Sequence, residues 1–272
     1  LVNIKTIPGL DYIREGDGEV RIGATTKLAL IARSSIINGN YGLLAQSAES
    51  VGTPEIRQMG TIGGNLCQDN RCWYYRYPHT LGGRILCFGK GKGPCHAIKG
   101  DNRYHAILGG KGCFAVCPSD IAVALTALDA RITVAGPDGE RIIPIAELYG
   151  TMGHKLETDE ILTEIQIPRL PHDAAQKFTK FRLRESVDFA VVSVASVVSV
   201  VEGICRDARI VLGGVAPTPW RATDAEDVIK GKDLNAQAVE DAAEAAVRNA
   251  KPLSKNAYKI EITKTLVKRT LL

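Results

Sequence analysis

Six of the seven cysteines in this 272-residue chain fall between Cys67 and Cys117. The same segment is rich in glycine and in basic and aromatic side chains, and it lacks the apolar periodicity of a helix or a strand. A stretch of this length without regular structure is uncommon inside a compact domain unless it has a function. Because the segment has few apolar residues with which to build a core, we expect cysteine-bound metal to hold it.

The odd number and the crowding of the cysteines argue against the disulfide framework of a secreted protein. We therefore expect a reducing compartment and place the protein in the cytoplasm, with the periplasm as the alternative. The formal net charge is only +4, and the basic residues are scattered, which excludes a nucleic-acid-binding protein. No apolar run reaches 18 residues, so the sequence predicts no membrane span.

Four cysteines of the segment are candidate metal ligands, namely Cys72, Cys87, Cys95 and Cys113. Four thiolates can hold a four-iron cluster or a tetrahedral zinc ion. Zinc sites usually contain cysteines two to four residues apart, and only Cys113 and Cys117 come near that spacing. The spacing leaves cluster and zinc open, and free, partly buried thiols are the third interpretation. Three histidines of the segment could replace a ligand, although solvated loop histidines are the simpler interpretation; they are His79, His96 and His105.

The regions on either side of the segment have the patterns of regular structure. We expect strands at 19–23, 131–135, 141–145 and 164–167, helices at 41–51 and after residue 119, and a linker at 168–173. Ser119 is the expected N-cap of the second helix. The last hundred residues contain expected strands at 177–182, 190–201 and 208–213, followed by helices at 236–249 and 257–271. Strands followed by helices indicate an α+β fold, with domains at 1–168 and 174–272.

A glycine-rich turn, Gly60-Thr61-Ile62-Gly63-Gly64-Asn65, precedes the cysteine segment. Its two adjacent glycines expose backbone N–H groups without an obstructing Cβ, which suits close approach by phosphate or ribityl oxygens. The turn is not G-x-G-x-x-G, so it does not support a Rossmann dinucleotide site.

Several ordered motifs accompany this turn. They are Ile56 to Asn65, Pro118-Ser119-Asp120 leading into Ala127-Leu128-Asp129-Ala130, Asp159-Glu160-Ile161-Leu162, Lys180 to Arg184, Asp188-Phe189-Ala190 and the closing 257–269 helix. With these motifs the chain resembles, over almost its whole length, the FAD-binding medium subunit of the xanthine dehydrogenase family of molybdenum hydroxylases. The resemblance implies an α+β fold of the PCMH/CO dehydrogenase flavoprotein type, followed by a C-terminal α+β domain with an antiparallel sheet and helices.

Within this family the cysteine segment, about 67–117, is similar to that of the 4-hydroxybenzoyl-CoA reductase beta subunit and of aldehyde oxidoreductase FAD subunits. Those subunits carry an additional [4Fe–4S] cluster. The resemblance implies that Cys72, Cys87, Cys95 and Cys113 are its ligands here, with Cys117 as a substitute for the fourth.

The resemblance also implies the flavin contacts. Phosphate and ribityl groups would lie against Thr61, Gly63, Gly64 and Asn65. Asp120 would accept a hydrogen bond from a ribityl or ribose hydroxyl, Leu162 would pack near the isoalloxazine ring, and Lys180 would lie at its polar edge. Each position also has a plain structural interpretation: Asp120 at a helix start, Leu162 in the core, and Lys180 as a solvated lysine.

One departure from the family is that its N-terminal lobe, which carries a Gly-Gly-Thr-Asp-like loop for the FAD pyrophosphate, has no counterpart before Leu1. Either the sequence is a fragment, or the lobe belongs to another polypeptide, or flavin binding is impaired. The first two explanations are favoured because the later flavin positions are intact.

The implied function is electron transfer, with no catalytic residue on this chain. Substrate chemistry would occur at molybdopterin on a large subunit, and [2Fe–2S] centres on a small subunit would connect it to FAD here. The cluster would connect the flavin to a ferredoxin-like partner, with NAD(P) as the other external electron partner. Two other functions remain open: a zinc-stabilised scaffold or binding subunit with a vestigial flavin fold, and a stand-alone oxidase of the vanillyl-alcohol oxidase type.

Overall fold

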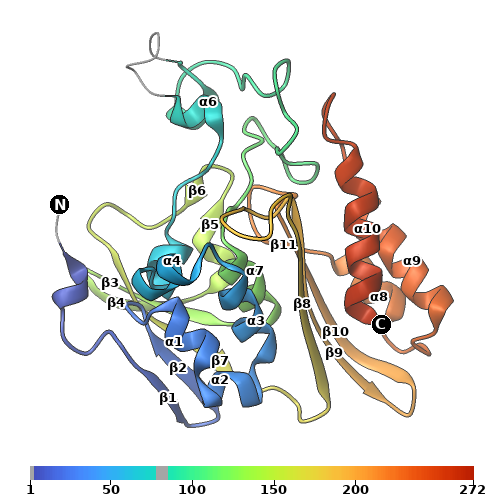
Figure 1. The fold of residues 1–272 in the computed structure, drawn as a ribbon, viewed down its shortest axis with the longest axis horizontal. Coiled ribbons are helices and arrows are strands. Elements are labelled where there is room, and N and C mark those ends of the chain that lie inside the picture. The colour runs from blue at the N-terminus through green and yellow to red at the C-terminus, as the bar shows by residue number, and fades with distance from the viewer. Residues whose placement is uncertain (1–2, 78–84) are drawn as a thin grey trace.

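The computed structural model describes residues 3–77 and 85–272. Two antiparallel sheets dominate it (Figure 1). The first sheet has the order β1-β2-β7-β3-β4, and the second has the order β11-β10-β9-β8. The strands of the first sheet are β1 (Ile13–Gly16), β2 (Glu19–Gly23), β3 (Arg131–Gly136), β4 (Gly139–Pro144) and β7 (Ile161–Pro168). Those of the second are β8 (Ala174–Phe181), β9 (Val192–Val201), β10 (Ile204–Gly213) and β11 (Trp220–Arg221).

Short helices pack against the first sheet and between the two sheets. They are α1 (Leu28–Arg33), α2 (Ser35–Asn40), α3 (Gly42–Ser50), α4 (Pro54–Met59), α5 (Ile62–Leu66) and α7 (Asp120–Ala127). Helix α7 contacts α3 and α5 on one side and β9 and β10 on the other. All eight residues of α7 are buried, so this helix lies at the centre of the molecule.

Strand β9 is buried on both faces, and its two faces belong to different cores. Ala195 and Val197 pack with the helices of the first sheet, whereas Val192 and Val194 pack with the C-terminal helices. Side chains alternate between faces along a strand, which explains how one strand joins the two cores. The C-terminal helices are α8 (Thr223–Ile229), α9 (Ala236–Val247) and α10 (Tyr258–Leu271).

The described part of the segment from Cys67 to Cys117 lies at one end of the molecule, above the two sheets in Figure 1. Its regular elements within the described residues are helix α6 (Trp73–Arg76) and the 3-10 turn η3 (Phe88–Lys90). Ile107 and Leu108 at its far end enter the C-terminal core. The segment is therefore anchored through the second sheet and its helices. His79 lies outside the described residues.

The remaining elements are short: η1 (Ile4–Thr6), η4 (Ile145–Leu148), β5 (Tyr149–Gly150) and β6 (Gly153–His154). Within the described chain, no helix is both long and apolar enough to cross a membrane.

Most expected elements are present, including the hairpin of β3 and β4 and the Ser119 cap, whose side chain accepts a hydrogen bond from the Ala122 N–H. Two expectations need correction. The glycine-rich turn is not open backbone, because residues 62–66 form helix α5 with Thr61 as N-cap. Helix α8 was not expected; its N-cap is Ala222, which makes no side-chain capping bond.

Candidate functional site

A cleft of about 540 Å³ opens where α5, α7 and β8 meet. Five of the seven expected flavin contacts line it, and they are Thr61, Gly64, Asn65, Asp120 and Lys180. They come from positions up to 119 residues apart in the printed sequence (Thr61 to Lys180). The fold therefore brings together residues that the sequence could only assign one by one.

The glycine-rich turn forms the cleft wall through Gly64 rather than through Gly63. The N–H of Gly63 donates to the Ala24 carbonyl at 2.9 Å, and a Cβ at this position would lie 2.8 Å from the same oxygen. Gly63 is buried and does not line the cleft. The Gly64 N–H donates to Thr61 Oγ1 at 3.1 Å. Both N–H groups have partners in the protein. The turn therefore does not present the expected row of N–H groups open to phosphate.

Asn65 connects the turn to the start of α7. The Ser119 hydroxyl donates to Asn65 Oδ1 at 2.7 Å, and Ser119 also caps α7. This fixes the amide side chain of Asn65 at the cleft wall. No hydrogen bond within the described residues uses its Nδ2, which is left as a donor toward a bound group.

Asp120 and Lys180 form a buried ion pair. Lys180 Nζ lies 2.6 Å from Asp120 Oδ2, and the two side chains are only 5% and 7% exposed. Lys180 also donates to the Ser50 carbonyl at 3.2 Å. Burial raises the pKa of Asp120, and the ammonium of Lys180 opposes that rise. Lys180 is therefore not a solvated strand lysine, and the pair places a fixed positive and negative charge beside the cleft.

Leu162 lies apart from these residues. It is 4% exposed in β7, pairs with Val134 of β3 and belongs to the first core. It lines neither this cleft nor the neighbouring cavity. Its contact with the isoalloxazine ring stays a prediction.

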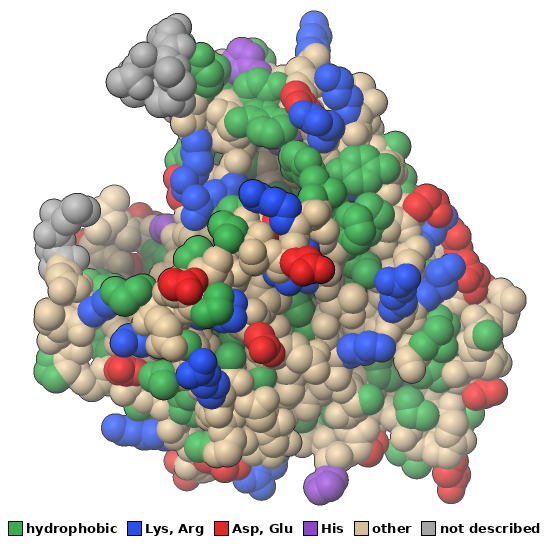
Figure 2. All heavy atoms as spheres, in the orientation of Figure 1, with side chains coloured by type: hydrophobic (Ala, Val, Ile, Leu, Met, Phe, Trp, Pro, Cys, Tyr) green, Lys and Arg blue, Asp and Glu red, His purple; other side chains and the backbone are tan. Residues whose placement is uncertain are grey.

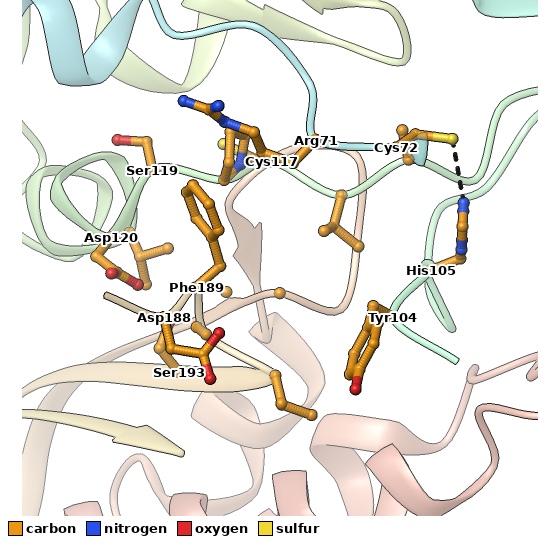
Figure 3. A pocket seen from close by; sticks show the side chains of 18 of the residues that line it. Arg71, Cys72, Tyr104, His105, Cys117, Ser119, Asp120, Asp188, Phe189 and Ser193 are labelled. Carbon is orange, nitrogen blue, oxygen red and sulfur yellow. Dashed lines mark hydrogen bonds between the residues drawn. The ribbon is translucent and has the colours of Figure 1, made fainter. Parts of the chain in front are cut away.

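A second cavity of about 480 Å³ adjoins the cleft (Figure 3). Both are lined by Arg71, Pro118, Asp120, Asp188 and Phe189. The Arg71 guanidinium lies 5.0 Å from the centre of the Phe189 ring, a cation–π contact. Sequence reasoning gave neither residue a role, although Phe189 lies in a motif that carries the family resemblance. Contacts between residues this far apart in the chain leave no local pattern.

The four expected cysteine ligands line one small cavity of their own. Cys87 and Cys113 are buried, and Cys72 and Cys95 are partly buried. A Cβ added at Gly89 would lie 3.8 Å from the Sγ atoms of both Cys87 and Cys113, so these two sulfurs flank Gly89. Burial, and then the nearby thiols, raise the pKa of Cys113.

Cys117 and Cys67 lie elsewhere. Cys117 lines the second cavity rather than the cysteine cavity, and burial raises its pKa to about 12. Cys67 packs against the first core, and burial raises its pKa to about 11. Of the two candidates for fourth ligand, Cys113 is the one that faces the other three thiols.

No group of three or more His, Cys, Asp or Glu side chains in residues 3–77 and 85–272 is placed to hold a metal ion. The four thiols nevertheless line one cavity.

His105 differs from the solvated loop histidine that we expected, since it is only 4% exposed. Its Nε2 lies 3.3 Å from Cys72 Sγ, as the dashed line in Figure 3 marks. Burial, with help from the nearby Lys259, lowers the pKa of His105 to about 4. His96, by contrast, is exposed, and its Nε2 lies 2.8 Å from the Leu86 carbonyl oxygen.

Comparison with known proteins matches two family models. Residues 1–170 match the FAD binding domain in molybdopterin dehydrogenase, and residues 176–272 match the CO dehydrogenase flavoprotein C-terminal domain. The aldehyde oxidoreductase FAD-binding subunit PaoB of Escherichia coli strain K12 is 34% identical over 97% of this chain and 80% of its own length. The 6-hydroxypseudooxynicotine dehydrogenase complex subunit alpha of Paenarthrobacter nicotinovorans is 29% identical over 100% and 78%.

Among solved structures, carbon monoxide dehydrogenase from Hydrogenophaga pseudoflava superposes with a TM-score of 0.75 at 27% identity, covering 97% of this chain and 78% of that one. The family models together cover both sheets and all the helices described above. The chain is therefore an oxidoreductase subunit that belongs to the FAD-binding medium subunits of the xanthine dehydrogenase and CO dehydrogenase family.

Proposed function

We propose that this chain is the electron-transfer subunit of a molybdenum-containing hydroxylase or reductase, with FAD in the cleft and a [4Fe–4S] cluster on the cysteine segment. The observation that carries the proposal is the convergence of two expected sets of residues on two separate cavities. Five flavin contacts line the cleft, and four thiols line the cysteine cavity. A molecule with only one of these sets would fit other functions.

The cleft and the cavity beside it suit a long cofactor with a polar and a flat aromatic part. Thr61, Gly64 and Asn65 would face its phosphate and ribityl groups, and Asp120 would accept a hydrogen bond from a ribityl or ribose hydroxyl. Lys180 would hold positive charge beside the ring. The second cavity adds an unpartnered buried polar atom, Nδ1 of His105. When bound, a flavin takes up two electrons and passes them on singly or as a pair.

The donor set supports a cluster over zinc. Cys72, Cys87, Cys95 and Cys113 supply four thiols to one cavity, and four thiolates are the usual ligands of a [4Fe–4S] cluster. Only Cys113 and Cys117 approach the close cysteine spacing of zinc sites, and Cys117 lines a different cavity, which favours a cluster over zinc.

The partners are proposed from the relatives and from the surface. Relatives are named as a dehydrogenase complex subunit and as a medium chain, which supports assembly with a large molybdopterin subunit and a small [2Fe–2S] subunit. Lys and Arg side chains gather with apolar ones on the upper part of the face in Figure 2, where the cysteine segment lies. The exposed basic residues in the described part of the cysteine segment are Arg71, Arg76, Lys92, Lys99, Arg103 and Lys111.

This basic and apolar surface supports an acidic, ferredoxin-like external partner, with NAD(P) as the alternative. The free cysteines support a reducing compartment, and we propose the cytoplasm. The boundary between the flavin domain (1–168) and the C-terminal domain (174–272) is likewise a proposal; it falls between β7 and β8, which belong to different sheets.

The test is an anaerobic ultraviolet–visible spectrum of the purified full-length subunit, with iron, sulfide, zinc and flavin measured on the same sample. We expect flavin bands on a broad brown absorbance, with about four irons per chain. Flavin without iron would remove the cluster and leave a conventional flavin subunit. Stoichiometric zinc without flavin would replace the proposal with the scaffold alternative.

A further inference from the structure

Cys72 and His105 lie on the wall between two cavities. Cys72 lines both the cysteine cavity and the second cavity beside the cleft, and His105 lines the second cavity. His105 Nε2 is 3.3 Å from Cys72 Sγ, which is hydrogen-bonding distance for sulfur. No other hydrogen bond in the described residues joins a side chain to one of the four thiols.

The position of His105 is fixed by its backbone. Its carbonyl accepts hydrogen bonds from Lys259 Nζ at 3.1 Å and from Asn256 Nδ2 at 3.0 Å. Its N–H donates to the Asn102 carbonyl at 3.0 Å. Lys259 and Asn256 are fully buried, and the ring of Trp73 lies 6.0 Å from the imidazole ring. The backbone of His105 is therefore held in place, and its buried imidazole lies beside Cys72.

The surroundings also decide which nitrogen carries the proton. A neutral imidazole has one N–H and one acceptor nitrogen. Nδ1 of His105 is buried without a partner, so a proton there would be an unsatisfied donor. A thiolate at Cys72 accepts and cannot donate. With a cysteine thiolate present, the proton belongs on Nε2 and points at the sulfur.

We propose that His105 donates an Nε2–H hydrogen bond to the Cys72 thiolate of the cluster and thereby raises the reduction potential of that cluster. The inference rests on the proposed cluster at Cys72, Cys87, Cys95 and Cys113. His105 acts here as a positioning residue, because it touches a ligand rather than the irons.

The direction of the effect follows from charge. The reduced cluster carries one more negative charge than the oxidised cluster, and part of that charge resides on the ligand sulfurs. A donor at the sulfur stabilises the reduced form more, and hydrogen bonds to sulfur are a recognised determinant of cluster potential. Removing the donor therefore makes the cluster harder to reduce.

The test is a redox titration of the full-length subunit in its complex, with the reduced cluster followed by electron paramagnetic resonance. His105→Leu removes the donor, and His105→Gln keeps an N–H in the same region. His96→Leu is the matched control, because His96 lines the cysteine cavity but bonds a backbone carbonyl. We expect His105→Leu to lower the ratio of reduced to oxidised cluster at a fixed potential about tenfold, which corresponds to about 59 mV for one electron. His105→Gln should recover much of the lost reduction potential, and His96→Leu should change the potential far less.

A second measurement begins with wild-type protein, which carries no substitution that could misfold. Protein labelled with ¹⁵N at histidine should show a weak ¹⁵N coupling to the reduced cluster in pulsed spectra, and His105→Gln should abolish it while His96→Leu keeps it. If the cluster is intact and has the same reduction potential in wild type and in His105→Leu, the inference is overturned but the proposed function is not. An intact wild-type cluster that shows no ¹⁵N coupling has the same consequence. An equal shift in His96→Leu would also overturn the inference. Wild-type protein without cluster iron would instead contradict the proposed function.

Discussion

The cleft and the cysteine segment are built in opposite ways. Each cleft residue is placed by regular structure and has a partner in the protein: Thr61 caps α5, and Asp120 at the start of α7 pairs with Lys180 of β8. The cysteine segment has two short helical elements in its described part, and four of its six thiols line one cavity. Among the described residues, His105 is the only one whose side chain is hydrogen-bonded to these four thiols. The cleft is held by packing and ion pairing, whereas the segment is held by its anchors on the C-terminal core and, in the proposed function, by the cluster.

The comparison teaches that the two sites should respond differently to substitution. Changes at the cleft should appear first as lost folding stability, because the residues there also hold the core together. Changes at the cysteines should appear first as lost metal, with a smaller effect on the rest of the fold.

The largest expected effect is at the cysteines. Cys113→Ser should reduce cluster iron from about four atoms per chain to a small fraction, because serine replaces a thiolate ligand. Cys117→Ser is the matched control four residues away, and it should retain the iron because Cys117 faces the second cavity. Iron and sulfide analysis of anaerobically purified protein measures both. The reverse result would make Cys117 the fourth ligand.

The next effect is at the buried ion pair. Lys180→Met leaves the Asp120 carboxylate buried without its partner and should lower the free energy of unfolding by about 3 kcal/mol. The surface pair of Arg141 and Glu160 provides the control, and Arg141→Met should lower the free energy of unfolding far less. Urea denaturation followed by circular dichroism measures both. Equal losses would mean that burial of the pair has no special importance.

A smaller effect should separate the two adjacent glycines. Gly63→Ala places a methyl group 2.8 Å from the backbone oxygen of Ala24 and should cost about 1–3 kcal/mol. At Gly64 the nearest atom would be Thr61 Oγ1 at 3.1 Å, and alanine also favours helix α5, so Gly64→Ala should stay within about 1 kcal/mol of wild type. Thermal or urea unfolding of both variants measures the two losses of stability. A more damaging Gly64→Ala would contradict the packing role of Gly63.

The smallest expected effect is on the pH dependence of stability, through Lys259 of α10. Its Nζ donates to the carbonyl of His105 in the cysteine segment. Burial lowers the pKa of Lys259 to about 7. Because the unfolded chain keeps its proton up to the usual value of 10.5, unfolding takes up a proton between these two values. The stability of wild type relative to Lys259→Met should therefore rise above pH 7, by at most about 1.4 kcal/mol per pH unit. Urea denaturation from pH 6 to 9 measures the difference, and a flat difference would exclude this shift.

Local patterns predicted much of the fold. The strand at 190–201 and the Ser119 cap could be predicted because each depends on neighbours in sequence. Helix α8 was missed because Ala222 gives no capping signal. The flavin residues came from resemblance to a family and not from composition or spacing.

Local sequence patterns could not predict the geometry of the site, for a physical reason. Lys180 and Asp120 are separated by 60 residues, and nothing near either residue indicates the other. The burial of His105 depends on Lys259, which lies 154 residues later. Such contacts are set by how α7, β8 and α10 pack, so single-sequence reasoning could name Asp120 and Lys180 but could not pair them.

The anchoring of the cysteine segment has a consequence for the order of synthesis. Asn102, His105 and Ala106 are held by groups on residues 254–259, about 150 positions later in the chain. Translation runs from the N-terminus, so the four thiols leave the ribosome well before the residues that hold their segment in place. A nascent chain thus exposes its cysteines while the carbonyl of His105 is still unheld, and the arrangement around Cys72 can be completed only after helix α10 has been made.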